Sequence, residues 1–200
     1  LGDYPGASVS LAVNTATGAP SVALDRLTFS GDLTPRTTSH STPPVPNSSP
    51  SLFSFDALAD WTSSNGPLAL APRHIEGTGA IEIAGSGYTL LESRSFAGTE
   101  LGNITNRLAV SVMPPDAIPN PFWGGDLQLF ASCPDSSLYN AFIGQVSLQD
   151  AFGGEYNALE FGIPNDITTV LRASGACTLR FALNVSPGSG TYAFDNMRFL

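Results

Sequence analysis

The stretch "TLRFALNVSPGSGTYAFDNMRF" runs from Thr178 to Phe199 and contains two alternating apolar and polar runs separated by Pro, Gly and Ser. Alternation with a period of two is the pattern of a β-strand that buries one face. A cluster of Pro, Gly and Ser between two such runs marks a turn. The chain is therefore expected to end in two strands, at 177–185 and 191–200.

Almost the same pattern opens the chain, as "SVSLAVNTATGAPSVALDRLTF" from Ser8 to Phe29. The two stretches align without a gap at a constant offset of 170. Between them lies a segment rich in Pro, Ser and Thr, "TPRTTSHSTPPVPNSSP", whose composition is that of an extended spacer. The sequence therefore predicts a tandem repeat: the C-terminal strand pair of a preceding homologous module at 1–33, a linker at 34–50 and one complete module at 51–200. The identical positions of the alignment are Ala12/Ala182, Asn14/Asn184, Gly18/Gly188, Ala23/Ala193, Asp25/Asp195 and Phe29/Phe199.

The Ser8–Phe29 strand pair is interpreted as a β-hairpin that cannot stand alone, because two isolated strands are only marginally stable in water. Its alternate positions are apolar, so it must pack against something. We expect it to complete a sandwich whose remaining strands lie outside this chain. The alternative is that it adds to a free edge of the 51–200 module.

The 51–200 module consists of short alternating segments separated by Gly, Pro, Asn, Asp or Ser. One segment, 165–175, fits a short helix that begins at Asn165 or Asp166 and stops at Gly175. About nine strands with one helix are typical of an all-β, two-sheet antiparallel jelly roll or galactose-binding-like sandwich. Besides the terminal pair, the expected strands are the opening "LFSFDAL" and the segments 79–85, 88–96, 107–114, 125–133, 141–149 and 156–164.

Charge and cysteine content restrict the partners and the compartment. The net charge of −9 argues against nucleic acid and anionic membrane surfaces, and no apolar run approaches the ~20 residues of a membrane span. The only two cysteines, Cys133 and Cys177, are most simply interpreted as one disulfide, which indicates an oxidising, extracellular compartment. Two buried free thiols are the alternative.

The module begins with "FSFDALADW" (53–61) and ends with "YAFDNMRF" (192–199), and both motifs resemble those of a known group. Many carbohydrate-binding modules of secreted bacterial polysaccharide hydrolases open with an aromatic–x–aromatic–acid strand followed by Trp. They close with an aromatic–x–x–Asp–Asn–aliphatic–x–aromatic strand. The resemblance extends to "VALDRLTF" (22–29) and, more loosely, to the loop "NPFWGGDLQLFASCP" (120–134). It implies a non-catalytic carbohydrate-binding module of a secreted multidomain protein. The alternative is a structural or adhesive sandwich repeat that attaches to proteins or surfaces.

The resemblance also implies a structural Ca²⁺ ion, because acids on the first and last strands of such modules often share one. Asp56 and Asp195 are the expected carboxylate ligands, with Glu76 or Asp60 as possible additions, and Ca²⁺ takes six to eight oxygen ligands. This chain has the shorter Asp56 where Glu is frequent in the resembled modules. The alternative is that Asp195 accepts hydrogen bonds from neighbouring backbone and Asp56 caps a turn.

Trp123 is the first candidate for sugar binding, since it lies in a loop of Pro and Gly that offers little to bury it. Sugar rings stack their C–H faces on aromatic rings, while amide side chains contact the hydroxyl groups. The predicted platform combines Trp123 with Tyr139, Asn140 and Gln145, and Tyr88 and Tyr156 are further candidates. The alternative is that Trp123 fills the space beneath its own loop, whereas Trp61 is expected in the core.

Catalysis within this chain is not expected. The only histidines are His40 in the linker and His74 in a loop, and neither a nucleophile motif nor an HExxH metal motif is present. Glu155 and Glu160 would point to opposite faces of a regular strand, and Glu82 and Glu92 are the pair that a hairpin would bring together. The expected ligand is a neutral glycan, since an acidic chain repels a polyanion unless Ca²⁺ bridges the two.

Overall fold

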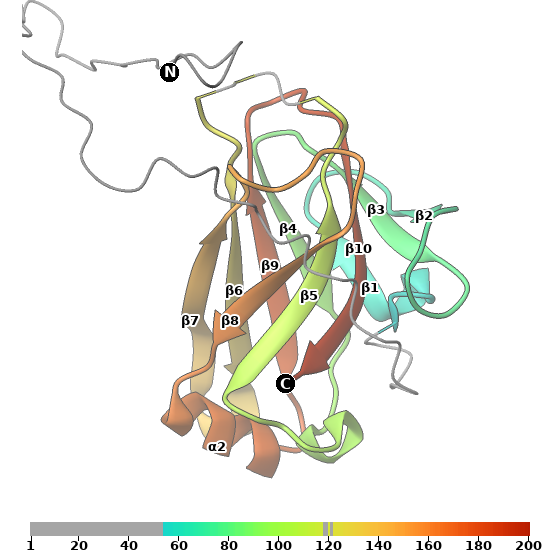
Figure 1. The fold of residues 1–200 in the computed structure, drawn as a ribbon. Coiled ribbons are helices and arrows are strands. Elements are labelled where there is room, and N and C mark those ends of the chain that lie inside the picture. Colours follow the sequence, from blue (N-terminus) through green and yellow to red (C-terminus); the bar gives the residue numbers. More distant parts are fainter. Residues whose placement is uncertain (1–53, 118–119, 121) are drawn as a thin grey trace, which may run out of the picture. The chain divides into compact units, whose positions relative to one another are not determined.

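A computed structural model describes residues 54–117, 120 and 122–200. The predictions for the Ser8–Phe29 strand pair and for the 34–50 linker lie outside the described residues. Within them, ten strands form two antiparallel sheets of five strands each (Figure 1). The fold is thus the all-β sandwich predicted from the sequence, with one α-helix that is described over its full length, α2 (Asn165–Ala173).

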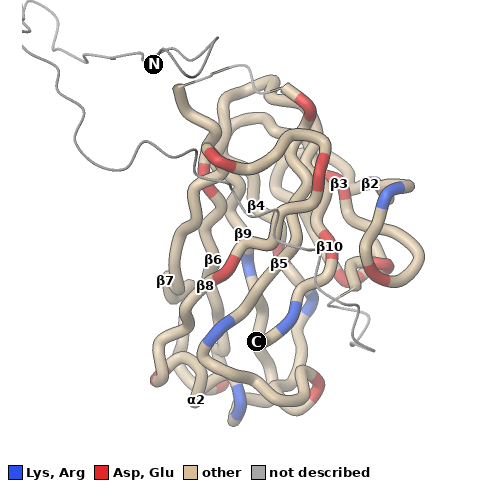
Figure 2. The backbone as a smooth tube through the Cα atoms, in the orientation of Figure 1, with Lys and Arg blue, Asp and Glu red and all other residues tan. Residues whose placement is uncertain are grey.

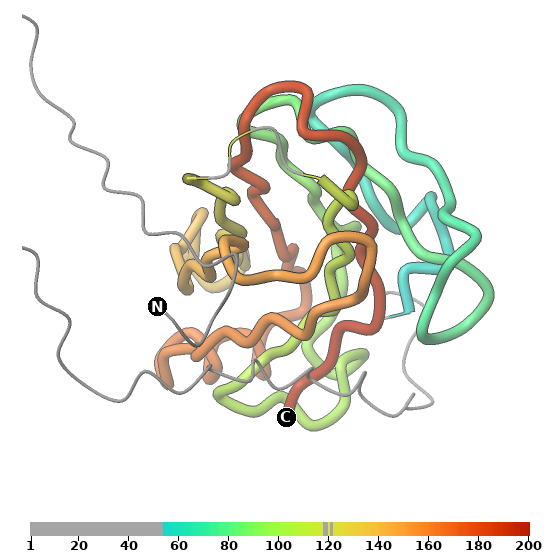
Figure 3. Tube along the Cα trace, turned by 45° about the horizontal axis from the view of Figure 1, so that its top comes forward, coloured from blue at the N-terminus to red at the C-terminus, as the bar shows by residue number. Residues whose placement is uncertain are grey.

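Sheet A and sheet B are the names used here for the two layers, and Figure 3 shows them from a second direction. Sheet A has the order β1 (Trp61–Ser63), β4 (Tyr88–Ser93), β9 (Thr178–Asn184), β6 (Asp126–Cys133) and β7 (Leu138–Ser147). Sheet B has the order β2 (Ala69–Ala71), β3 (Ala80–Ala84), β10 (Thr191–Phe199), β5 (Arg107–Met113) and β8 (Asn157–Gly162). Three short 3-10 turns, η1 (Leu58–Asp60), η2 (Gly98–Leu101) and η3 (Pro134–Ser136), lie in the connections.

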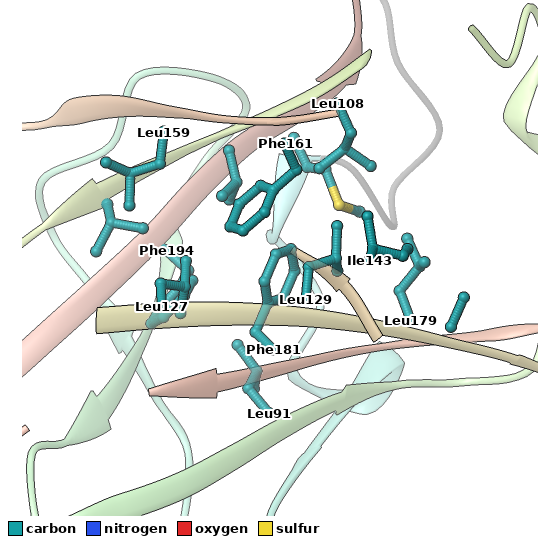
Figure 4. Packing of buried hydrophobic residues seen from close by; sticks show 14 of the residues in the cluster. Leu91, Leu108, Leu127, Leu129, Ile143, Leu159, Phe161, Leu179, Phe181 and Phe194 are labelled. Atoms are coloured by element: carbon teal, nitrogen blue, oxygen red, sulfur yellow. The ribbon is translucent and has the colours of Figure 1, made fainter. Parts of the chain in front are cut away.

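The core lies between the sheets, where alternate residues of both layers meet (Figure 4). Phe181 of β9 contacts Phe194 of β10 and Phe161 of β8, with ring centroids 5.9 and 6.3 Å apart. Trp61 is 3% exposed and stacks on Phe55 at 4.6 Å, which confirms its prediction as a core residue. The period-two alternation of the sequence therefore separates the buried face of each central strand from its outer face.

The two C-terminal strands are not paired with each other, although the sequence suggests a simple strand pair. β9 is the central strand of sheet A and β10 is the central strand of sheet B. The Pro-Gly-Ser segment between them, 185–190, therefore connects the two layers. Residues 178–199 supply the middle of both sheets, which explains why alternate positions of each run are apolar.

The opening of the module differs from the sequence prediction. The described part of "LFSFDAL" forms no strand: Phe55 has a left-handed backbone with φ of 55°, and η1 follows directly. The short strands β1 and β2 come after it, each of three residues. Strands of that length carry too little alternation to be recognised in the sequence.

The predicted disulfide is present, joining Cys133 at the end of β6 to Cys177 just before β9. Asp135 strengthens the same junction, because its Oδ2 accepts hydrogen bonds from the backbone N–H groups of Gly175 and Ala176. Among the described residues, no helix has the length and apolar character needed to cross a membrane.

Candidate functional site

The outer face of sheet A gathers polar and aromatic side chains from four neighbouring strands. The strand register places them in three rows that run across β4, β9, β6 and β7, because paired residues of antiparallel strands point to the same side. With strands about 4.8 Å apart and rows about 7 Å apart, the rows span roughly 14 Å in each direction. We call this surface the sheet A face. Its rows are Tyr88–Asn184–Asp126–Ser147, Leu90–Ala182–Gln128–Gln145 and Glu92–Arg180–Phe130–Phe142.

The first two rows are connected by hydrogen bonds between side chains. The Tyr88 hydroxyl donates to Gln128 Oε1 at 3.2 Å. Gln128 Nε2 donates to Asp126 Oδ1 at 3.0 Å and to Gln145 Oε1 at 3.3 Å, and Asn184 Nδ2 donates to Asp126 Oδ2 at 3.1 Å. Two predicted sugar-binding residues, Tyr88 and Gln145, are therefore brought together through a residue that the sequence analysis did not single out.

The third row combines an ion pair with two phenylalanine rings. Arg180 Nε donates to Glu92 Oε2 at 2.8 Å, and its Nη1 donates to Asn140 Oδ1 at 2.9 Å. The rings of Phe130 and Phe142 meet edge to face at 5.4 Å, and Phe142 is 54% exposed. Asn140, a predicted sugar-binding residue, thus lies beside the third row, next to accessible apolar ring surface.

Trp123 lies in the loop that leads into β6, three residues before Asp126 of the first row. It is 39% exposed and the adjacent Phe122 is 68% exposed, so Trp123 is not fully buried beneath its own loop. The following glycines hold the loop close to the sandwich: Gly124 N–H donates to Gln149 Oε1, and Gly125 has φ of +91°. A Cβ on Gly125 would lie 2.5 Å from the Asn184 carbonyl oxygen, so any larger residue would push the loop away from β9.

The other two predicted residues lie apart from the three rows. Tyr139 is 69% exposed near η3, where its hydroxyl donates to the Pro134 carbonyl at 3.4 Å. Tyr156 lies over sheet B, packed against the small cluster of Ala71, Ala80 and Ala193, and donates to the Arg73 carbonyl at 2.7 Å. Burial, together with the nearby charge of Asp195, raises the pKa of the Tyr156 phenol.

Sequence reasoning missed the residues that fill the rows, above all Gln128, Phe130, Asn184 and Arg180. Each occupies an outward position of a predicted strand, so the alternation alone could have shown that it faces solvent. The order of the strands in the sheet could not be inferred in the same way. The proximity of β4, β9, β6 and β7 depends on contacts between segments that are far apart in the chain.

The predicted calcium ligands Asp56 and Asp195 meet the same loop, 75–79, outside sheet B. Asp195 is fully buried, and its carboxylate accepts hydrogen bonds from the backbone N–H groups of Ile75, Glu76 and Asn196. Asp56 Oδ1 accepts hydrogen bonds from the backbone N–H groups of Thr78 and Gly79. Burial raises the pKa of Asp195 despite these bonds, and the nearby charge of Asp56 adds to the rise.

The two carboxylates fit part of a calcium site. Ser111 pairs with Asp195 in the strand register, and its buried hydroxyl has no hydrogen-bond partner among the described residues. However, no group of three His, Cys, Asp or Glu side chains in the described ranges has the arrangement of a metal site. Ca²⁺ at Asp56 and Asp195 therefore stays a prediction, and Asp60, which was considered as an additional ligand, pairs with Arg94 at 3.0 Å instead.

The acidic pair considered for catalysis is separated by the fold. Glu82 belongs to β3 of sheet B and Glu92 to β4 of sheet A, so the two do not face each other across a hairpin. On the sheet A face, the carboxylates are those of Glu92 and Asp126, and both are engaged by side chains of the face itself.

Comparison with known proteins supports the fold. No family model matches the sequence, and no curated protein is significantly similar to it. Among solved structures, a module specific for non-crystalline cellulose aligns over 76% of this chain and 94% of its own, with 13% identity and a TM-score of 0.52. A carbohydrate-binding module of the β-sandwich superfamily, studied for its promiscuous specificity, aligns over 74% of this chain with 13% identity and a TM-score of 0.51.

This chain spans 60% of the length of that second structure. The K1 cleaved adhesin domain of Lys-gingipain from Porphyromonas gingivalis W83 aligns at 14% identity over 72% of this chain and 93% of its own. Its TM-score is 0.44. The chain therefore has the jelly-roll sandwich fold found in carbohydrate-binding modules, as its terminal motifs suggest.

Proposed function

We propose that this protein is a non-catalytic module that binds a neutral polysaccharide on the sheet A face. One observation carries the proposal: Tyr88, Asn140 and Gln145, chosen from the sequence as sugar-binding residues, converge on one outer face with further amides and exposed rings. Aromatic rings and amides are the groups that suit the apolar faces and the hydroxyls of sugars. We also propose that Trp123, in the loop before the start of β6, extends this surface.

The charged groups of the sheet A face support a neutral ligand. The Arg180 guanidinium pairs with Glu92 and Asn140, and the Asp126 carboxylate accepts from two amides. A charged sugar would have to compete with these internal partners. The same pairing supports a binding role rather than hydrolysis, because hydrolysis requires a pair of carboxyl groups, one on each side of the scissile bond.

We further propose that the module acts outside the cell as part of a larger protein with a preceding homologous module. A disulfide persists in oxidising compartments, which supports an extracellular location. The aligned Ser8–Phe29 stretch supports a second copy, since its apolar positions correspond to core positions of β9 and β10.

Calcium at Asp56 and Asp195 is also proposed as a structural element of the module. Calcium at about 1 mM, a range typical of extracellular sites, should raise the melting temperature relative to EGTA. Asp56→Asn should remove this response. An identical melting temperature in calcium and in EGTA would contradict the proposal.

Affinity electrophoresis in gels containing hydroxyethylcellulose, xyloglucan, arabinoxylan or galactomannan tests the function, together with pull-down on amorphous cellulose. Cellulose is a reasonable first ligand because a structure with this fold is specific for its non-crystalline form. At least one neutral polysaccharide should retard the protein. Tyr88→Ala should reduce the affinity about fivefold, since an aromatic contact contributes about 1 kcal/mol.

Leu70→Ala is the matched control, because Leu70 is 49% exposed on edge strand β2 of the other sheet. It should leave retardation unchanged. If no polysaccharide retards the wild-type protein, or if the Tyr88 and Leu70 variants behave alike, the proposed site is wrong. A scaffold or adhesive role would then be the better interpretation.

A further inference from the structure

We infer that Asp126 is the positioning residue of the sheet A face: it orients the amides that would meet a glycan without contacting the glycan itself. The inference rests on the proposed function. It concerns how one buried carboxylate determines which hydrogen-bonding groups the face presents.

Asp126 begins β6 and is only 7% exposed, although the row that contains it lies on the outer face. Its two oxygens are used separately. Oδ1 accepts from Gln128 Nε2 at 3.0 Å, and Oδ2 accepts from Asn184 Nδ2 at 3.1 Å. The carboxylate thus lies behind the two amides and not in front of them.

A carboxylate determines the orientation of an amide because it can only accept hydrogen bonds when ionised. An amide turned the other way would place its own oxygen against a carboxylate oxygen, and two buried acceptors without a proton between them repel each other. Gln128 and Asn184 must therefore both turn their nitrogens toward Asp126. A neutral residue at position 126 would impose no such choice.

The orientation is passed to the neighbouring strands through Gln128. Its second N–H donates to Gln145 Oε1 on β7, and its carbonyl oxygen accepts from the Tyr88 hydroxyl on β4. A single carboxylate therefore governs polar groups on four strands, β4, β9, β6 and β7.

This arrangement determines which hydrogen-bond donors and acceptors the face offers to a ligand. Because the Tyr88 proton and the Gln145 carbonyl are already used, the Tyr88 oxygen is left as an acceptor and the Gln145 nitrogen as a donor. Asn184, whose nitrogen faces Asp126, is left with its carbonyl oxygen. Fixing this pattern before binding lowers the cost of ordering the side chains when the glycan arrives.

Asp126→Asn is the direct test, since it keeps the shape of the side chain and removes its obligate acceptor character. In the free protein, NMR should show changed side-chain NH₂ resonances for Gln128 and Asn184. Affinity for whichever polysaccharide of the panel retards the wild-type protein should fall about tenfold, as expected when a charge-assisted network is broken. The effect should shrink to about twofold or less in a Gln128→Ala, Asn184→Ala background, because the residues through which Asp126 acts are then absent.

Ile83→Val serves as the stability control, because Ile83 is buried in β3 of sheet B, away from the sheet A face. It should lower the melting temperature and leave the affinity unchanged. An Asp126→Asn variant that binds as well as Ile83→Val, or that loses as much affinity in the double-alanine background as in the wild type, overturns the inference.

The NMR measurement separates this inference from the proposed function. If no polysaccharide of the panel binds, the proposed function fails, but the free protein still reports on the network. Unchanged NH₂ resonances of Gln128 and Asn184 in Asp126→Asn would then overturn the positioning role. Changed resonances would support it.

Discussion

Phe122 and Trp123 are both exposed, and Trp123 lies three residues before Asp126 of the sheet A face. The two glycines that follow contact the sandwich: Gly124 N–H donates to Gln149 Oε1, and the Gly125 carbonyl accepts from the Leu148 N–H. The exposure of Trp123 therefore favours a role in binding over a role in the core.

Trp123→Ala should abolish retention on the polysaccharide that binds the wild-type protein and lower the melting temperature only slightly. The reason is that Trp123 is 39% exposed and contributes less to the core than a buried ring such as Trp61. Differential scanning fluorimetry alongside affinity electrophoresis checks both parts. A fall of many degrees in the melting temperature would identify the indole as a core element instead.

The Asp56 carboxylate makes stability dependent on pH in acid. Burial alone would raise its pKa, but hydrogen bonds from Ser54, Thr78 and Gly79 outweigh that effect and hold the pKa below its usual value. The ionised form therefore stabilises the fold above about pH 4, and this contribution is lost as the pH falls through the lowered pKa. The raised pKa of Asp195 acts in the opposite direction, since protonation relieves the cost of its burial.

Asp56→Asn should lower the free energy of unfolding by about 1 kcal/mol near pH 7, because it loses the charge-assisted part of these hydrogen bonds. The difference from the wild type should shrink as the pH falls below about 4, because the unfolded carboxyl takes up a proton there, and it should be lost once the pH falls below the lowered native pKa. Urea titrations at several pH values measure it. A difference that stays constant from pH 7 to pH 3 would show that Asp56 acts through packing and not through its charge.

At the scale of elements, the central strands were predictable because each alternates over five residues or more. The predicted segments 107–114 and 125–133 correspond to β5 (Arg107–Met113) and β6 (Asp126–Cys133) almost residue for residue. The turn at Phe55 was not predictable, because the sequence around it alternates like a strand, whereas its backbone is left-handed and η1 follows. The candidate site was only half predictable, because the residues of its rows are outward positions on strands whose neighbours the sequence does not reveal.

The Cys133–Cys177 disulfide joins the end of β6 to the start of β9, with a sequence separation of 44 residues. On the chain-entropy model, a closed loop of that length contributes roughly 4 kcal/mol to stability. Reduction, or the double Ser variant, should therefore lower the urea midpoint strongly, with the native fold retained in the absence of denaturant. Two reactive thiols in the unfolded, unreduced protein would show that the bond does not form.

The whole molecule is acidic, and its charges are unevenly distributed. The chain has no Lys, and several of the described Arg positions lie in the lower half of Figure 2, whereas acidic positions occur in both halves, including the loops at the upper end. The net charge of −9 creates a field that repels polyanions over about one Debye length, close to 10 Å at 0.1 M salt. The field does not act on a neutral polysaccharide.

Affinity for a neutral polysaccharide should therefore change less than about twofold between about 0.02 M and about 0.5 M salt, because its contacts are stacking and neutral hydrogen bonds. Alginate, as a polyanion of similar length, should not retard the protein at low salt, where repulsion is strongest. Electrophoresis at the two salt concentrations measures both effects. Binding of alginate that weakens as salt rises would mean that Arg180 leaves Glu92 to pair with the ligand, and the neutral-glycan proposal would have to be replaced by one for an acidic glycan.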